Sequence, residues 1–454
     1  MRQKRELQSS LFSRRPRNEI ARELEAVSQV LDANPEILAL VYQDLVGLKS
    51  AATGRTGLTA DQVLRCAFLK QYRQLTYEEL ALYLADSVSF QAFSRLAEEQ
   101  YPSASTLQEN IKTIQAATWE ALHRLLVSYA AAAGMEKGRK IRLDATGVET
   151  NVHPPTDALL LQDGVGVITR LLVRGQELRP LPAYRFADHR RAVKKRVVRI
   201  RDAKKPQVRV QAYRELLPLA AQTRGYALAA IAALSGFVGE RLEMTFGAKA
   251  LRDRLERAVG LLGRVEDQAR RRVLQGEKVP AAEKVISFFE CHTDIIEKGD
   301  REPLYGHKVF LTGGASGLIL DCLVRRGNPA DASMFMELLA RQEEIYGRAP
   351  LKAAADGGFA SRENLRRAKE QGVRDVAFSK RRGLSVLEMV KSLWVYKKLK
   401  NFRAGIEAAI STLKRAFGLS RCTWTGWEGF QQYVWSAVVS YNLAVLGRWK
   451  MAAV

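Results

Sequence analysis

The sequence predicts a mixed α/β core that follows an all-helical N-terminal domain and is interrupted by a basic helical insertion. Three observations predict this class. The first 135 residues show helical periodicity only, strand-like alternation begins at Lys140 and returns after residue 284, and the segment between is helical and rich in Lys and Arg. We therefore expect a helical domain at 1–135, a core at 136–156 and 285–430, an insertion at 157–284 and a C-terminal helix at 431–454.

The N-terminal helices are marked by capping boxes, in which a hydroxyl residue precedes a Gln or Glu by three positions. Thr59–Gln62, Thr76–Glu79 and Ser105–Gln108 each match this pattern at the head of an amphipathic run. The three short helices expected between Val63 and Leu96 fit a helix-turn-helix that enters a DNA groove, and equally a plain helical subdomain. We expect this domain to serve DNA binding or oligomerisation.

The charge of the chain narrows the class of its partners. Lys and Arg number 72 against 49 Asp and Glu, which gives a formal charge of +23. So large an excess favours a polyanionic partner, and nucleic acid is the leading candidate. The alternative is a ribosome-like or surface-adhering basic protein. The four cysteines form no CxxC pair, so they predict neither a disulfide framework nor a zinc site. The sequence shows no secretory signal and no apolar run that could span a membrane, so we expect a cytoplasmic protein without a membrane partner.

Basic residues concentrate in the first half of the expected insertion. Eleven Lys and Arg lie between Arg185 and Arg209, against Asp188 and Asp202 alone. A solvated helical face is the usual origin of such a run, but its density and sign favour contact with DNA phosphates. The residues predicted to bind DNA there are Arg190, Arg191, Lys194, Lys195, Arg196 and Arg199.

Alternating residues predict the strands of the core. Ile141, Leu143 and Ala145 alternate with polar neighbours, and Gly147 allows a turn into a second strand at Val148–Val152. Further strands are expected at 285–289, 308–312, 318–324, 351–356 and 375–379, with helices at 331–346, 361–371 and after residue 384. Strands that alternate with helices in this way predict a mixed sheet covered by helices.

Two acidic residues occupy strands of the expected sheet. Asp144 lies within the first strand, where a solvent-facing acid is the commoner explanation for a single carboxylate. Asp356 ends a strand and precedes Gly357-Gly358, which is a typical position for a functional residue, with a helix N-cap as the alternative. Asp321 and Asp331 lie near the same sheet, and their spacing alone does not exclude them.

A third acid, Glu407, lies on a helix. Arg403 precedes it by four residues and Lys414 follows it by seven, so that all three share one face. An exposed ion pair is the ordinary explanation of this pattern. Ile410 and Ser411 on the same face instead predict partial burial.

Aromatic residues surround the same helix in the sequence. Trp394 precedes it, and Trp424 and Trp427 follow it. Packing in a core is the commoner role of tryptophan, and stacking on an unpaired base is the alternative. His307 and Lys308 fit either contact with DNA or a structural role in their strand.

The three acids and the strands around them resemble bacterial insertion-sequence transposases of the DDE type, most closely the loosely classified ISNCY group. The resemblance runs from about residue 55 to 448, and its matching segments are Leu143-Asp-Ala-Thr146, Ala355-Asp-Gly-Gly-Phe-Ala-Ser361 and Arg403-x3-Glu407-x6-Lys414. The last segment repeats the spacing of the Tyr-x2-Arg-x3-Glu-x6-Lys signature, although Lys400 stands at the tyrosine position. Such transposases have a ribonuclease H-like catalytic core, which is therefore the fold expected for the mixed sheet.

The resemblance also implies a mechanism. Asp144, Asp356 and Glu407 would be the catalytic carboxylates and would hold two Mg²⁺ ions, or Mn²⁺ in their place. Water would cut the phosphodiester at the end of the element, and the freed 3′-hydroxyl would attack target DNA. Arg403 and Lys414 would contact DNA. The implied partners are the double-stranded DNA of terminal inverted repeats and of the target, bound by a homodimer or higher oligomer at the bacterial nucleoid.

Two alternatives keep the fold and change the function. One is a catalytically inactive or domesticated protein that binds terminal repeats. The other is a ribonuclease H-like nuclease that cuts DNA without joining it. The intact set of three acids favours an active enzyme, and strand-transfer products would separate a transposase from a nuclease.

Overall fold

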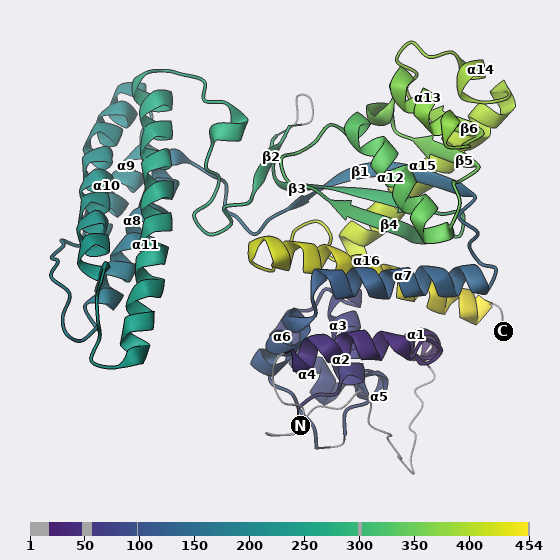
Figure 1. Cartoon of the computed structure of the whole chain (residues 1–454), viewed down its shortest axis with the longest axis horizontal. Coiled ribbons are helices and arrows are strands. Elements are labelled where there is room, and N and C mark those ends of the chain that lie inside the picture. The colour runs from purple at the N-terminus through teal and green to yellow at the C-terminus, as the bar shows by residue number, and fades with distance from the viewer. Residues whose placement is uncertain (1–17, 48–56, 98, 298–301, 453–454) are drawn as a thin grey trace. The chain divides into compact units, whose positions relative to one another are not determined.

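The chain divides into two compact units (Figure 1). The computed structural model describes residues 18–47, 57–97, 99–297 and 302–452. The first unit runs to residue 151 and resumes at residue 306, and the second comprises residues 152–305. Each unit has a hydrophobic core of its own.

Helices form the N-terminal part of the first unit. They are α1 (Glu19–Asp32), α2 (Glu36–Val46), α3 (Ala60–Tyr72), α4 (Tyr77–Asp86), α5 (Val88–Ser94), α6 (Ala104–Thr113) and α7 (Ala116–Ala132). The capping boxes predicted at Thr59 and Thr76 are confirmed, because both reciprocal hydrogen bonds are present in each. The box predicted at Ser105 is wrong. The N-cap of α6 lies two residues earlier, at Ser103, whose hydroxyl accepts a hydrogen bond from the N–H of Thr106.

The sheet of the first unit is mixed. Its strands are β1 (Lys140–Glu149), β3 (Leu304–Gly313), β4 (Ile319–Val324), β5 (Lys352–Ala355) and β6 (Asp375–Phe378), in the spatial order β4-β3-β1-β5-β6. Strand β3 is antiparallel to β1 and β4, whereas β5 is parallel to β1 and β6. The predicted mixed α/β core is therefore confirmed.

Two details of the predicted strands are wrong. Strand β1 continues through Gly147, which pairs with Lys308 in the ladder between β1 and β3, so no turn forms there. The strand predicted at residues 285–289 is irregular. Its apolar residues Val285 and Phe288 instead pack into the core of the helical unit, and the N–H of Val285 donates to the Gln268 side chain.

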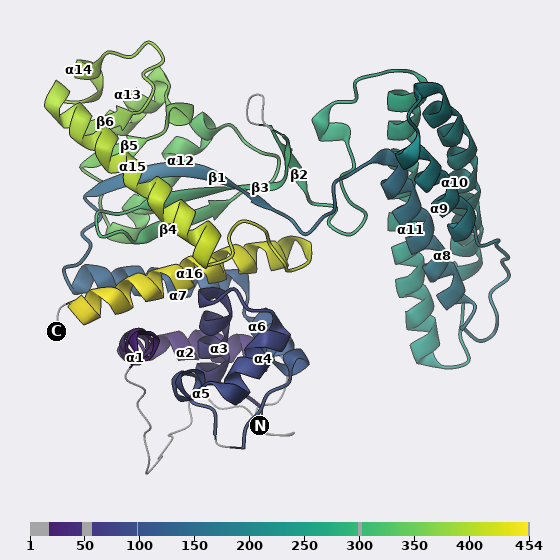
Figure 2. The same cartoon turned by 180° about the vertical axis from the view of Figure 1, so that it is seen from behind.

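Helices cover both faces of the sheet. Helix α12 (Asp331–Tyr346) packs on β4 and α13 (Arg362–Glu370) packs on β6. Helix α15 (Leu393–Ala416), which follows the short α14 (Val386–Met389), crosses β1, β5 and β6 on the opposite face (Figure 2). The last helix, α16 (Gly426–Ala452), packs against α1, α3 and α7 and joins the N-terminal helices to the core of this unit.

The second unit consists mainly of packed helices. They are α8 (Asp157–Gly175), α9 (Arg190–Asp202), α10 (Pro206–Leu234) and α11 (Leu242–Ala269), and the short strand β2 (Asp294–Ile296) follows them. Leu161, Ile168, Leu216, Leu255 and Leu262 are fully buried between these helices. Among the described residues of the whole chain, no helix combines the length and the apolar character needed to cross a membrane.

Candidate functional site: three carboxylates around Arg403

Asp144 and Asp356 come from neighbouring strands. In the parallel ladder of β1 and β5, Leu143 pairs with Ala355, so the two acids that follow them lie side by side. Adjacent strands are separated by about 4.8 Å. Leu143 and Ala355 are fully buried, and side chains alternate between the faces of a sheet. The two carboxylates therefore face α15, on the side opposite to these apolar neighbours.

Helix α15 brings Arg403 and Glu407 to the same point. The Nη2 atom of Arg403 lies 2.8 Å from Oδ2 of Asp144 and 3.4 Å from Oδ1 of Asp356. Its Nη1 atom lies 2.5 Å from Oε1 of Glu407. The three acids named from the sequence thus surround one guanidinium group.

The burial of these side chains is unequal. Asp144 is 13 % exposed and Arg403 15 %, which excludes the solvent-facing interpretation of Asp144. Glu407 is 59 % exposed, so its predicted partial burial is wrong. The buried stripe of α15 is formed by residues such as Ile406 and Ala409, and Glu407 lies at the margin of that stripe.

The pKa values of the two strand acids shift in opposite directions. Burial raises the pKa of Asp144, and Asp356 and Glu407 add to this rise while Arg403 opposes it. Burial acts in the same sense on Asp356, but the hydroxyl of Ser379 outweighs it, with backbone N–H groups and Arg403, so its pKa is lowered. Asp356 therefore binds a proton less readily than Asp144 does.

Ser379 and Arg142 belong to this site and were missed at the level of sequence. The hydroxyl of Ser379 donates to Oδ1 of Asp356 at 2.7 Å and accepts from the N–H of Gly357 at 2.8 Å. Arg142 donates to the carbonyl of Phe402 at 3.2 Å, and this hydrogen bond links β1 to α15. A signal existed for both: Ser379 ends the predicted strand that follows Asp356, and Arg142 precedes Asp144 by two residues on the same strand face.

Lys414 lies on the same side of α15 as Arg403 and Glu407. Its Nζ atom donates to the backbone carbonyl of Gly147 at 2.9 Å. This bond ties the last turn of α15 to β1. Its predicted contact with DNA stays a prediction.

The donor set suits a divalent metal in type. Carboxylate oxygens are the ligands that Mg²⁺ prefers, and those of Asp144, Asp356 and Glu407 converge on one cationic centre. In the part of the chain that the structure describes, however, no three carboxylate, imidazole or thiol groups approach closely enough to hold an ion. The guanidinium of Arg403 lies where those oxygens would meet.

The other acids near the sheet have structural partners. Asp321 is 1 % exposed, and Arg341 binds both of its carboxylate oxygens, at 2.5 and 2.7 Å. Asp331 accepts from Nζ of Lys308 at 3.0 Å. His307 is fully buried, so the structural interpretation of His307 and Lys308 is supported.

The predicted DNA-binding residues of the insertion all lie on α9. Val193, Val197 and Ile200 form its buried face. The basic residues lie on the remaining surface, exposed or half-buried: Arg190, Arg191, Lys194, Lys195, Arg196 and Arg199. Acids neutralise part of this charge, since Asp188 pairs with Arg190 and Glu215 of α10 pairs with both Arg196 and Arg199. Among the described residues, no ion pair is made by Arg191, Lys194 or Lys195.

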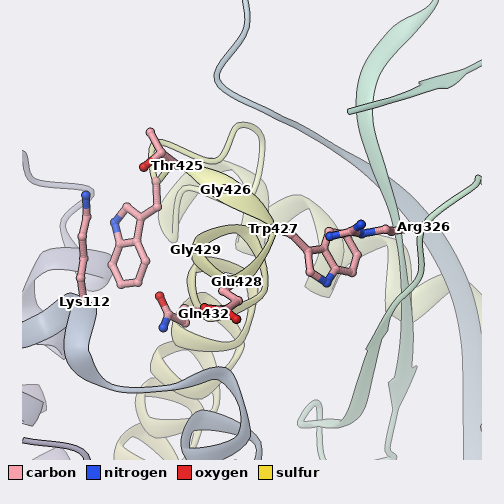
Figure 3. Close-up of a pocket in the computed structure, with 9 residues that line it drawn as sticks. Lys112, Arg326, Thr425, Gly426, Trp427, Glu428, Gly429 and Gln432 are labelled. Carbon is pink, nitrogen blue, oxygen red and sulfur yellow. The ribbon is translucent and has the colours of Figure 1, made fainter. Parts of the chain in front are cut away.

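A cavity of about 460 Å³ lies at the start of α16 (Figure 3). Lys112 and Arg326 flank it, and the Arg326 guanidinium lies 4.4 Å from the ring centre of Trp427. Trp424, which also lines it, is buried, and the ring of Trp427 stacks with that of Phe430. These contacts support the packing role for both tryptophans.

The sequence from residue 290 to residue 443 matches the family model described as a transposase DDE domain. The chain carries a transposase DDE domain. The resemblance to insertion-sequence DDE transposases is therefore confirmed. The matched DDE domain covers about a third of the chain and contains Asp356, Arg403 and Glu407, whereas Asp144 lies before its start. No curated protein and no solved structure matches the chain.

Proposed function

We propose that the chain is a transposase that cleaves the DNA ends of an insertion sequence and joins them to target DNA. The observation that carries this proposal is the convergence of Asp144, Asp356 and Glu407 on one point of a chain that contains a transposase DDE domain. The strand order β4-β3-β1-β5-β6, with antiparallel strands on one side of β1 and parallel strands on the other, supports a ribonuclease H-like core.

The same three carboxylates are the proposed ligands of two Mg²⁺ ions, with Mn²⁺ as a substitute. Bound there, the ions would activate the attacking oxygen and stabilise the leaving oxygen of an in-line displacement. Asp144 and Asp356 are held by neighbouring strands, so their oxygens are fixed relative to each other. The Ser379 hydroxyl orients the Asp356 carboxylate, and Glu407 is presented by α15.

One site serves both chemical steps, because only the nucleophile differs between them. Water attacks the phosphodiester at the end of the element in the first step. The 3′-hydroxyl that this cleavage frees attacks the target strand in the second. Arg403 and Lys414 are the proposed phosphate contacts beside the acids, and the exposed cations of α9 are the proposed contacts along the duplex.

The N-terminal helices are the proposed DNA-binding or oligomerisation domain. Helix α3 is buried along nearly its whole length, so it is not available to a DNA groove. Leu82, Tyr83 and Val88, on α4 and at the start of α5, are exposed apolar side chains, which supports a protein contact there. We therefore propose that the protein works on terminal repeats and target DNA as a homodimer or higher oligomer, in the bacterial cytoplasm at the nucleoid.

Cleavage of DNA that carries the ends of the element tests this function. We expect Asp356→Ala to abolish Mg²⁺-dependent cleavage and to leave DNA binding nearly unchanged, because it removes a metal ligand and no phosphate contact. Glu363→Gln on α13 is the matched control, since Glu363 is an exposed acid of the same unit that pairs with Arg366. Cleavage retained in Asp356→Ala would contradict the assignment.

The products separate the alternatives. Joined products between end DNA and target DNA identify a transposase, and cleavage without joining identifies a nuclease. Binding without either reaction in the native chain would identify an inactive terminal-repeat-binding protein.

A further inference from the structure

We propose that Arg403 is an internal cation that takes the place of the divalent ions in the metal-free protein and must leave it before they bind. The inference rests on the proposed function, because it concerns the same metal site. It assigns to Arg403 a role in regulating metal loading that differs from a simple phosphate contact.

The contacts of Arg403 are those expected of a substitute cation. Its guanidinium makes ion pairs with all three acids, at 2.8 Å to Asp144, 3.4 Å to Asp356 and 2.5 Å to Glu407. Three carboxylates held this close repel one another strongly where water is scarce. A single positive charge at their centre offsets that repulsion, and Asp144 depends on it most because it is the least exposed of the three.

Arg403 and the ions compete for the same oxygens. Mg²⁺ binds carboxylate oxygen at about 2.1 Å, and the oxygens it would need from Asp144 and Asp356 are those that hold Nη2 of Arg403. These oxygens cannot bind Mg²⁺ and Arg403 at the same time. Metal binding in the absence of DNA is therefore weakened by the cost of displacing Arg403.

The displacement is nevertheless possible. Three carboxylates and one guanidinium together carry a net charge of −2. Two divalent ions in place of the guanidinium would neutralise the carboxylates more fully than Arg403 does. The Nε atom of Arg403 is buried and makes no hydrogen bond to any described residue, so the guanidinium is not held by all of its donors.

A DNA phosphate would favour the exchange. A guanidinium binds phosphate through two parallel hydrogen bonds, so the displaced Arg403 gains a partner when DNA is present. Metal and DNA would then each favour the arrangement that the other requires. By thermodynamic linkage, each raises the affinity for the other by the same factor.

Binding of Mn²⁺ to the full chain without DNA tests the inference, with free Mn²⁺ measured by electron paramagnetic resonance. We expect Arg403→Gln to bind Mn²⁺ about tenfold more tightly than the native chain. Arg403→Lys should lie between them, because one ammonium reaches fewer of the acids than the fork of a guanidinium. Arg415→Gln is the matched control, since it removes the same charge from an exposed position of the same helix, and we expect no more than about a twofold change.

Two outcomes would overturn the inference. One is Mn²⁺ affinity in Arg403→Gln that is equal to or weaker than native. The other is an equal rise in affinity in Arg415→Gln, which would reduce the effect to net charge. If circular dichroism shows that Arg403→Gln is unfolded, Arg403→Lys is compared with the native chain instead. An Mn²⁺ affinity of Arg403→Lys equal to the native value would then overturn the inference.

Asp144→Asn separates this inference from the proposed function. If Asp144→Asn loses Mn²⁺ binding but Arg403→Gln does not gain it, the metal site stands and only the role of Arg403 fails. If Asp144→Asn binds Mn²⁺ as the native chain does, the metal site itself is wrong and the proposed function fails with it.

Discussion

Asp144, Asp356 and Asp321 are the same side chain in three different environments. Asp356 is half-exposed and has its pKa lowered by hydrogen bonds, whereas burial raises the pKa of Asp144. Asp321 is almost fully buried and is bound through both oxygens by Arg341. Asp144 and Asp356 share one partner, Arg403, which we propose a metal displaces. Asp321 is buried and is bound by Arg341 through both oxygens, so its role is structural.

Asp321 gives a prediction about stability. Replacing it with Ala leaves the Arg341 charge partly buried, and among the described residues Glu120, at 2.7 Å, is then its one remaining ion-pair partner. Breaking a buried pair from one side costs about 3–5 kcal/mol in the free energy of unfolding. Urea denaturation measures this loss, and Asp331→Ala, whose Lys308 pair is more exposed, should cost less. Equal losses in the two variants would contradict the structural role of Asp321.

Lys70 gives a prediction about pH. Burial lowers its pKa to about 8, and nearby Lys112 adds to the effect. Between pH 8 and the ordinary pKa of lysine, about 10.4, the unfolded chain binds more protons at this residue than the folded chain, so this residue makes stability rise with pH. We expect Lys70→Met to be more stable than native by about 2 kcal/mol at pH 7, and this advantage to shrink toward pH 10. Urea midpoints at a series of pH values measure it; a constant difference would contradict a buried charge at Lys70.

At the scale of elements, the sequence predicts features that depend on residues close together in the chain, such as helix caps and the faces of helices. The capping boxes at Thr59 and Thr76 and the shared face of Arg403 and Glu407 follow from spacing within one helix, and the structure has them. The bond from Arg403 to Asp144 joins residues 259 positions apart and depends on how α15 crosses the sheet. No local pattern contains that information.

The two wrong predictions about strands, at residues 285–289 and at Gly147, have one physical origin. The apolar residues of the segment 285–289 suit a strand, but their partners are helices of the second unit, so the segment stays irregular. Gly147 permits a turn, but β3 lies beside β1 on both sides of this residue, so the β1–β3 pairing continues through Gly147. In both places the tertiary neighbours decide a conformation that the residues themselves leave open.

Helix α9 gives a prediction at this scale. Its outer face carries Arg191, Lys194 and Lys195, which make no ion pair among the described residues and are therefore available to phosphates. Replacing these three with Gln should reduce the slope of log affinity for duplex DNA against log salt by about 2 to 3, since each phosphate contact contributes about 0.9. Binding at several salt concentrations measures the slope.

A matched control lies on another helix of the same unit. Lys249, Arg254 and Arg257 are exposed on α11, and their replacement with Gln removes the same charge from the same unit. We expect a smaller change in slope from these replacements. Equal slopes in the two triple variants would mean that DNA responds to net charge and that α9 does not follow the duplex.

At the scale of the whole molecule, the chain has two separate hydrophobic cores, and each can be weakened alone. Leu255 is fully buried in the core of the second unit, and Leu339, a residue of α12, is buried in the core of the first. A buried Leu→Ala change costs about 2–5 kcal/mol. We expect two unfolding transitions in calorimetry, with Leu255→Ala lowering the temperature of one by several degrees and Leu339→Ala lowering that of the other. A single transition shifted by both substitutions would show that the two units unfold together, and the helical insertion would then be part of one cooperative domain with the sheet that carries the carboxylates.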